Sequence, residues 1–195
     1  MKKQIQLYNH PFRFFKKRTY TFRTFFKDIL KILGHRHYIR DTHQSKRISK
    51  RFSEHIMLVV TGINDCIYCE WGHSNFALRA GSSKPEIEAL LSQQFRNFPS
   101  DEIAALVFAQ HYAESSGYPS KEALSRLIKE YGKEKGRDII IFCEMITVGN
   151  LLGNSISAFL SRLKGIPPEH GSIFFEIIVF LCGGFLFDRY MNRNR

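Results

Sequence analysis

Residues 49–73 read SKRFSEHIMLVVTGINDCIYCEWGH. The spacing of the apolar residues predicts a helix that begins near Ser45 or Ser49 and continues through Ile63. The Asn-Asp pair that follows predicts a break and an N-cap for the next helix. The stretch therefore predicts a helical hairpin with a Cys-x-x-Cys motif at the start of its second helix.

The polar groups of this hairpin suggest redox chemistry. On a helix, Cys66, Cys69 and His73 share one face, because they are separated by three and four residues. Two cysteines one turn apart can come within disulfide range. The helix N-terminus favours the thiolate, most strongly at Cys66, and His73 can carry a proton near neutral pH. The hairpin could bring Glu54 back against the second helix, where it would orient His73.

The rest of the chain also shows helical periods, and nothing alternates convincingly with period two, so the predicted fold class is all-α. Turn and capping signals divide the pattern. Before the hairpin they predict an amphipathic helix within Pro11–Leu33 stopped by Gly34, and a polar connection over His35–Lys46. After it they predict an end of the cysteine helix at Gly81, a capping box at Ser83–Glu86 that opens a helix through Leu91, a helix opened by Pro99–Glu102, and a turn and cap at Gly117–Ser120. The C-terminal part is predicted to contain a helix from Lys121 to about Tyr131, a long helical segment from about Arg137 to Leu163, a break at Gly165–Pro168 and an apolar run over Ile173–Phe187.

Composition describes a globular chain of 195 residues that is 44% hydrophobic and has four cysteines. That cysteine density is too low for a disulfide-stapled secreted domain. No apolar segment of the secretory kind follows the first residues, so the expected compartment is a reducing cytoplasm, with membrane association as the alternative. Cys143 and Cys182 lie in apolar runs and are expected in the core or an interface.

The formal charge of +11 is concentrated at one end. Residues 1–51 carry 15 Lys and Arg against two acids, a net of +13, whereas the remainder carries a net of −2. The favoured interpretation of this basic N-terminal region is a helix that docks its Phe face on the body or on a neighbouring subunit. Contact with an anionic membrane surface comes second, and nucleic acid is the least favoured partner.

Three parts are predicted: a basic aromatic N-terminal extension over residues 1–44, a helical core domain over 45–165, and an apolar C-terminal helix with a basic tail over 166–195. The apolar run at 173–187 is shorter than the roughly 20 residues of a spanning helix. Burial in an oligomer interface is therefore preferred for it, with a membrane anchor as the alternative.

The pattern Glu54-x11-Cys66-x2-Cys69-x3-His73 resembles the signature of the AhpD-like (alkylhydroperoxidase) branch of the carboxymuconolactone decarboxylase family. The resemblance covers roughly Ser49–Pro119. It implies an AhpD-like all-helical bundle, assembled as a homotrimer or hexamer, with thiol-dependent peroxidase or disulfide oxidoreductase activity.

On this resemblance, Cys69 is the peroxide-attacking thiol, and Cys66 is the resolving, more exposed one. Glu54 and His73 form the proton relay. The implied partners are a hydroperoxide substrate and a dithiol or lipoyl-type protein reductant, and no cofactor is needed beyond the Cys66–Cys69 disulfide. The chain departs from the pattern at Tyr68, where AhpD proper has a histidine, which favours redox activity over fast peroxide turnover.

Two other functions stay open at this point. The two thiols, His73 and Glu54 could provide four zinc ligands, although structural zinc sites usually draw their ligands from two loops. A metal-binding or redox-sensing adaptor protein without enzymatic activity is therefore the first alternative. A lactone enzyme of the decarboxylase type, acting without the cysteines, is the second.

Overall fold

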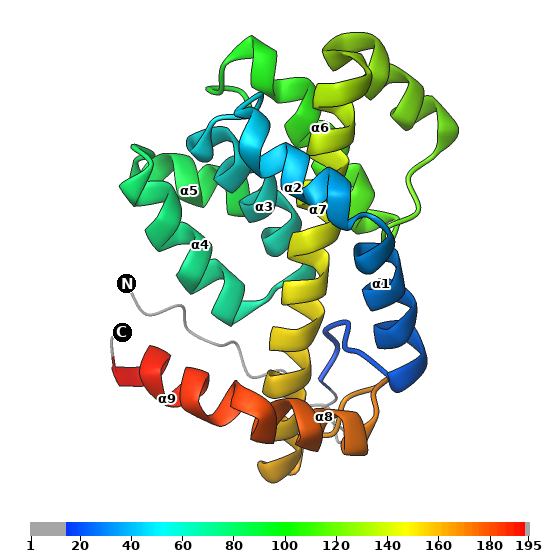
Figure 1. Cartoon of the computed structure of the whole chain (residues 1–195). Coiled ribbons are helices and arrows are strands. Elements are labelled where there is room, and N and C mark those ends of the chain that lie inside the picture. Colours follow the sequence, from blue (N-terminus) through cyan, green and yellow to red (C-terminus); the bar gives the residue numbers. More distant parts are fainter. Residues whose placement is uncertain (1–14, 194–195) are drawn as a thin grey trace.

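The computed structural model describes residues 15–193. Within this range every regular element is helical, apart from an isolated bridge between Phe15 and Pro168. The predicted all-α fold is therefore confirmed. Figure 1 shows one long helix running the length of the molecule, with the other helices packed along it.

The helices follow one another along the chain with short connections. They are α1 (Phe22–Gly34), α2 (Arg36–Ser45), α3 (Lys50–Asn64), α4 (Ile67–Arg79), α5 (Lys84–Leu91), α6 (Ser100–Glu114), α7 (Lys121–Leu163), α8 (Ile173–Val179), the π-helical turn η1 (Phe180–Gly184) and α9 (Phe185–Arg193). The main apolar core lies where α3 packs against α6 and α7.

The predicted hairpin is formed by α3 and α4. The side chain of Ser49 caps α3, and Asp65 takes a left-handed conformation just after the helix ends. The predicted break is thus present, but the predicted cap is wrong. Cys66 is itself the N-cap of α4, because the left-handed Asp65 turns the chain before the new helix starts.

The long helix α7 is interrupted once, at Gly132, where φ is 74°. This break separates the two helical segments that the sequence predicts, and only glycine adopts such a conformation readily. In the part of the chain that the structure describes, α7 alone is long and apolar enough to cross a membrane, and 72% of its most apolar window is buried inside the molecule.

The predicted polar connection over His35–Lys46 is wrong, because most of it is helix α2. A buried carboxylate on α7 explains the difference. Asp138 accepts hydrogen bonds from Thr42, at 2.7 Å, and from Arg47, at 2.6 Å. These contacts stabilise a helix whose own sequence has little apolar character.

The predicted N-terminal helix is α1, which begins at Phe22 and ends at Gly34. Thr21 caps α1 in a capping box, and residues 1–14, including Phe12 and Phe14, lie outside the described residues. Phe25 packs against Phe175 of α8. Phe22, Phe26, Leu30 and Leu33 are exposed, so the Phe face docks only in part on the body of the molecule. Its docking on a neighbouring subunit stays a prediction.

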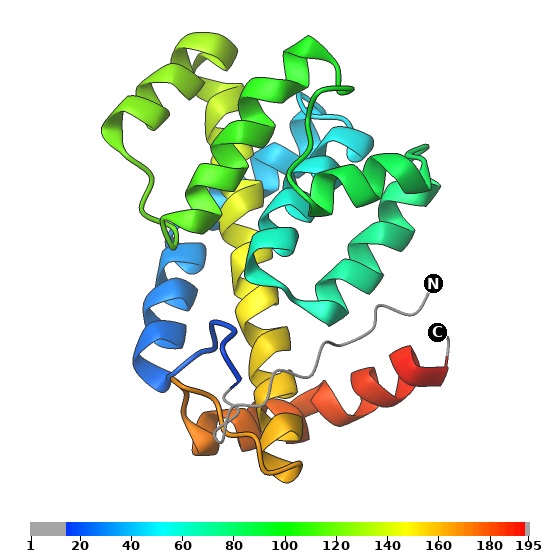
Figure 2. The ribbon, with the colours of Figure 1, turned by 180° about the vertical axis from the view of Figure 1, so that it is seen from behind.

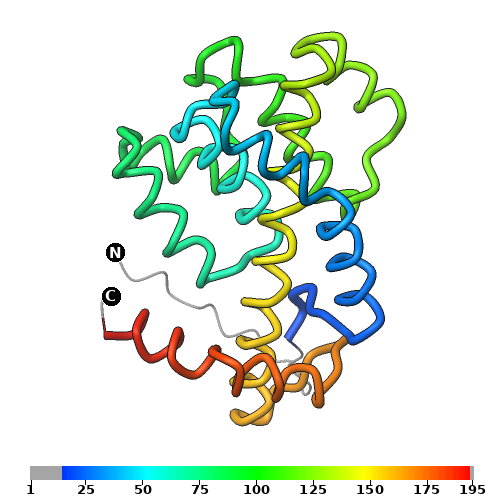
Figure 3. Tube along the Cα trace, in the orientation of Figure 1, coloured from blue at the N-terminus to red at the C-terminus, as the bar shows by residue number. Residues whose placement is uncertain are grey.

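The apolar run at 173–187 does not form one continuous helix. It is divided among α8, η1 and the start of α9, with Gly183 at a φ of 150°. Figure 3 shows this segment crossing the C-terminal end of α7. Many of its apolar side chains are exposed, among them Phe174, Leu181 and Leu186. The proposed division into three parts stays a prediction.

Candidate functional site

The two cysteines lie together at the first turn of α4. The Sγ atoms of Cys66 and Cys69 are 2.8 Å apart, in hydrogen-bond contact, and both cysteines are free thiols. The Sγ atom of Cys66 also accepts the backbone N–H of Cys69, at 3.3 Å. As the N-cap, Cys66 thus occupies the position where helix amides stabilise negative charge.

This geometry separates the acidities of the two thiols. The hydrogen bond from Cys69 lowers the pKa of Cys66, and the backbone amides of Cys69 and Tyr68 and the charge of Lys17 act in the same direction against burial. The pKa of Cys69 is raised because its proton is donated to Cys66 and because it is buried beside that charge. When the reduced pair loses one proton, the thiolate therefore forms at Cys66 and accepts the hydrogen bond from Cys69, as expected from the helix position.

The exposure of the two thiols is the reverse of what the resemblance implies. Cys66 is completely buried, packed among Tyr68, Ile156 and Met191, whereas Cys69 is partly exposed. The expectation that Cys66 is the more exposed cysteine is wrong. Residues from the C-terminal segment cover Cys66, so a reagent from solvent reaches Cys69 first.

Glu54 and His73 form a second pair beside the thiols. The Nδ1 atom of His73 lies 2.7 Å from a carboxylate oxygen of Glu54, which reaches across from α3 to α4. Both side chains are partly buried. A carboxylate at Nδ1 orients the ring and leaves Nε2 for a proton acceptor or donor. Within residues 15–193, no hydrogen bond joins this pair directly to either sulfur.

Helix α9 packs against the turn of α4 that carries the Cys-x-x-Cys motif. The hydroxyl of Tyr68 donates a hydrogen bond of 2.7 Å to Asp188, and the Trp71 ring makes edge contacts with Phe187 and Tyr190. Figure 2 shows α4 and α9 on the same side of α7. Burial and the Asp188 carboxylate raise the pKa of Tyr68, so this hydroxyl stays protonated.

Two glycines of α7, Gly149 and Gly153, leave the space that the cysteine side chains occupy. The sequence analysis did not identify them. A Cβ atom at Gly153 would stand 2.6 Å from the Cys66 sulfur, and one at Gly149 would stand 3.9 Å from the Cys69 sulfur. The glycines lie one helical turn apart, so the sequence does contain a signal, a Gly-x-x-x-Gly pair inside an apolar helix. That signal predicts a close approach without telling which element approaches.

The remaining candidates lie outside the thiol site. His55 is fully buried between Glu102, at 2.8 Å, and Ser82, at 2.9 Å, as expected of a structural histidine. Cys143 is buried in the core, and burial raises its pKa, whereas Cys182 is exposed.

The structure does not assemble the ligand set of the zinc alternative. The part of the chain that the structure describes contains no group of three or more His, Cys, Asp and Glu side chains placed to hold a metal ion. The two sulfurs form one pair, and Glu54 and His73 form another.

Comparison with known proteins found one family model that resembles the hairpin and its surroundings. The model of the carboxymuconolactone decarboxylase family, which includes the AhpD-like branch, matches residues 34–111, the segment from the end of α1 through most of α6. Searches of curated proteins and of solved structures found no match. The segment that carries Glu54, the cysteine pair and His73 is therefore similar to the carboxymuconolactone decarboxylase family.

Proposed function

We propose that the protein is a thiol-dependent oxidoreductase that cycles Cys66 and Cys69 between a dithiol and a disulfide. The observation that carries the proposal is the 2.8 Å contact between the two sulfur atoms at the start of α4. A thiolate, a second thiol in reach and a nearby proton carrier are the groups needed to reduce a peroxide or a disulfide.

Cys69 is the attacking thiol in this proposal, because it is the sulfur that solvent reaches. In the singly ionised pair its proton lies on the hydrogen bond to the Cys66 thiolate. Transfer of that proton to Cys66 produces the Cys69 thiolate without moving a heavy atom. Cys66 is the more acidic thiol, yet Cys69 can still be the attacking one, because the two sulfurs share a single proton.

With a hydroperoxide as oxidant, the Cys69 thiolate attacks the terminal oxygen. An S–O bond forms, the O–O bond breaks, and the alcohol leaves as its oxygen takes a proton from the Glu54–His73 pair. The Cys66 sulfur then attacks the sulfenic acid on Cys69, an S–S bond forms, and water leaves. A dithiol donor returns the disulfide to two thiols and is itself oxidised.

Tyr68 sets the preference between oxidants. Its hydroxyl keeps its proton and is bound to Asp188, so it does not act as a base beside Cys69. Disulfide exchange with a protein or small-molecule partner needs one proton carrier fewer than peroxide cleavage. We therefore propose disulfide exchange as the faster reaction and hydroperoxide reduction as the slower one.

The proposed context follows from this chemistry. A thiol pair that turns over needs a reducing compartment and a dithiol reductant, for which a lipoyl-type protein is one chemical class. No cofactor takes part in the steps above. A homotrimer or homohexamer is proposed from the family, and the exposed apolar side chains of α1 and α8 support association with another surface.

The experiment that tests the proposal counts thiols. The reduced protein is titrated with an organic hydroperoxide, and free thiols are measured at each step. We expect two thiols to be lost per peroxide in the wild type and in the control variant Cys182→Ser, whose cysteine is exposed and is not part of the pair. Cys66→Ser is expected to stop at a trappable sulfenic acid, and Cys69→Ser to react much more slowly. Equal peroxide consumption by Cys69→Ser and the wild type would refute the mechanism.

A further inference from the structure

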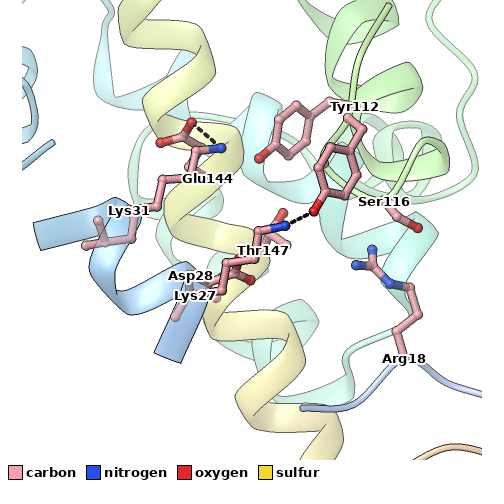
Figure 4. A pocket seen from close by; sticks show the side chains of 12 residues that line it. Arg18, Lys27, Asp28, Lys31, Tyr112, Ser116, Glu144 and Thr147 are labelled. Carbon is pink, nitrogen blue, oxygen red and sulfur yellow. Dashed lines mark hydrogen bonds and ion pairs between the residues drawn. The ribbon is translucent and has the colours of Figure 1, made fainter. Parts of the chain in front are cut away.

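A cavity of about 230 Å³ lies between α1, the end of α6 and the middle of α7. It belongs to a different face of α7 from the cysteine pair. Figure 4 shows Lys27 and Lys31 of α1, with Lys31 bound to Glu144 of α7, and Arg18 and Tyr112 on the other side. Charged side chains from distant parts of the sequence thus meet around one hollow.

The carboxylates of this cavity are already bound within the protein. Glu144 is almost completely buried and lies 2.9 Å from the Nζ atom of Lys31 and 2.8 Å from Nδ1 of His35. Asp28 accepts a hydrogen bond of 2.9 Å from the hydroxyl of Tyr20. Among the described residues, neither carboxylate forms an ion pair with the other cations of the cavity.

Arg18 and Lys27 are those other cations. In residues 15–193, no ion pair joins either of them to a carboxylate. Arg18 makes a 3.4 Å hydrogen bond to the Asn64 side chain, and Lys27 contacts the hydroxyl of Tyr118, with its Nζ atom 4.7 Å from the ring centre. The lining contains three cations, since Lys31 is counted with Arg18 and Lys27, and two carboxylates. The cavity therefore carries a net charge of +1.

The walls divide into a closed end and an open end. Tyr112 is 4% exposed, whereas Tyr118 is 68% exposed and stands at the mouth beside Lys27. Burial raises the pKa of Tyr112, so its hydroxyl remains available as a donor. Ile32 and Val148 supply apolar surface. Since a cavity of about 150 Å³ holds benzene, this volume has room for an apolar body of that size and a carboxylate.

We propose that this cavity binds a small organic monocarboxylate, with its charge between Arg18 and Lys27 and its apolar body against Ile32 and Val148. The net charge of +1 matches a monoanion rather than a phosphate dianion. A guanidinium binds a carboxylate through two parallel N–H donors, and Lys27 adds a point charge at the mouth. The residues that line this cavity lie outside the segment that matches the family model.

The test uses calorimetric titration of the full chain with sodium hexanoate, 1-hexanol and inorganic phosphate. We expect hexanoate to bind at one saturable site, and hexanol and phosphate each to bind at least tenfold more weakly. Arg18→Gln and Lys27→Gln are each expected to weaken hexanoate binding about tenfold, since each removes one charge-assisted contact.

Arg23→Gln is the matched control, because Arg23 is an exposed cation on α1 that does not line the cavity. It should leave hexanoate affinity unchanged, and circular dichroism should show that all three variants are folded. If Arg18→Gln does not fold, Lys27→Gln carries the test. The proposal is overturned if hexanoate shows no saturable binding, if hexanol or phosphate binds as tightly, or if Arg23→Gln weakens binding as much as Lys27→Gln does. Replacing both cysteines of the Cys66–Cys69 pair should not change hexanoate affinity, which separates this site from the redox function.

Discussion

The close approach of α7 to the cysteine pair gives a sharp prediction for Gly153→Ala. The new Cβ atom would stand 2.6 Å from the Cys66 sulfur, far inside normal contact, and 3.4 Å from the Tyr68 ring, which is an ordinary contact. Cys66 is completely buried, so its sulfur has no free space into which to move. Overpacking of this kind costs about 1–3 kcal/mol.

Gly149→Ala is the matched control, one turn away on the same helix. Its Cβ atom would meet only the Cys69 sulfur, at 3.9 Å, which is an ordinary contact. Both substitutions gain about 0.4–1 kcal/mol, because alanine restricts the unfolded chain more than glycine and favours helix. Gly149→Ala should therefore be more stable than the wild type, and Gly153→Ala should be less stable than Gly149→Ala by about 1–3 kcal/mol.

The assay is urea unfolding of the three reduced proteins, with the rate of thiol alkylation measured in parallel. The difference between the variants corresponds to several degrees in Tm for a chain of this size. Gly153→Ala should also change the alkylation rate of the pair, because the sulfurs must separate or shift. Equal stability and equal alkylation rates for the two alanine variants would show that α7 does not press on Cys66.

Three further predictions concern the same region. The ultraviolet absorbance of the thiolate should show that Cys66 titrates with a pH midpoint below that of an ordinary thiol, and Cys69→Ala should raise this midpoint, because the hydrogen bond from Cys69 is the main cause of the lowered pKa; an unchanged midpoint would contradict the assignment. Tyr68→Phe should lower the free energy of unfolding by about 1.5–3 kcal/mol and speed alkylation of Cys66, since the bond to Asp188 is lost; Asp188→Asn, which keeps an acceptor, should show smaller effects, and the reverse order would argue against the hydrogen bond. Glu176→Gln should cost about 3–5 kcal/mol in urea unfolding, because the carboxylate is completely buried against one arginine; a loss below about 1 kcal/mol would show that the ion pair is not needed.

Local patterns predict the hairpin and the pairing of its polar groups well. Helical spacing places Cys66, Cys69 and His73 on one face, and the turn after α3 returns Glu54 to His73, at 2.7 Å. These are consequences of short-range geometry, in which residues three or four apart on a helix are neighbours. Their catalytic roles stay predictions.

Features that depend on distant residues could not be predicted. Helix α2 looks like a polar loop in sequence, because its stability comes from Asp138, which lies 96 residues after Thr42. The burial of Cys66 likewise depends on Met191, which no local signal connects to the cysteine motif. The apolar run at 173–187 was predicted as one helix because its hydrophobicity is continuous. In the structure, the non-helical backbone at Gly183 divides it.

The hydrogen bond between Tyr68 and Asp188 joins residues 120 positions apart, which has a consequence for the order of folding. The α3–α4 hairpin is local and can form early, whereas its cover arrives only after a long loop has closed. During refolding the two thiols are therefore assembled before they are shielded. An oxidant present in that interval meets both sulfurs, whereas the same oxidant added to the folded protein meets mainly Cys69. Refolding yield should accordingly depend on the reducing agent far more than the stability of the finished protein does.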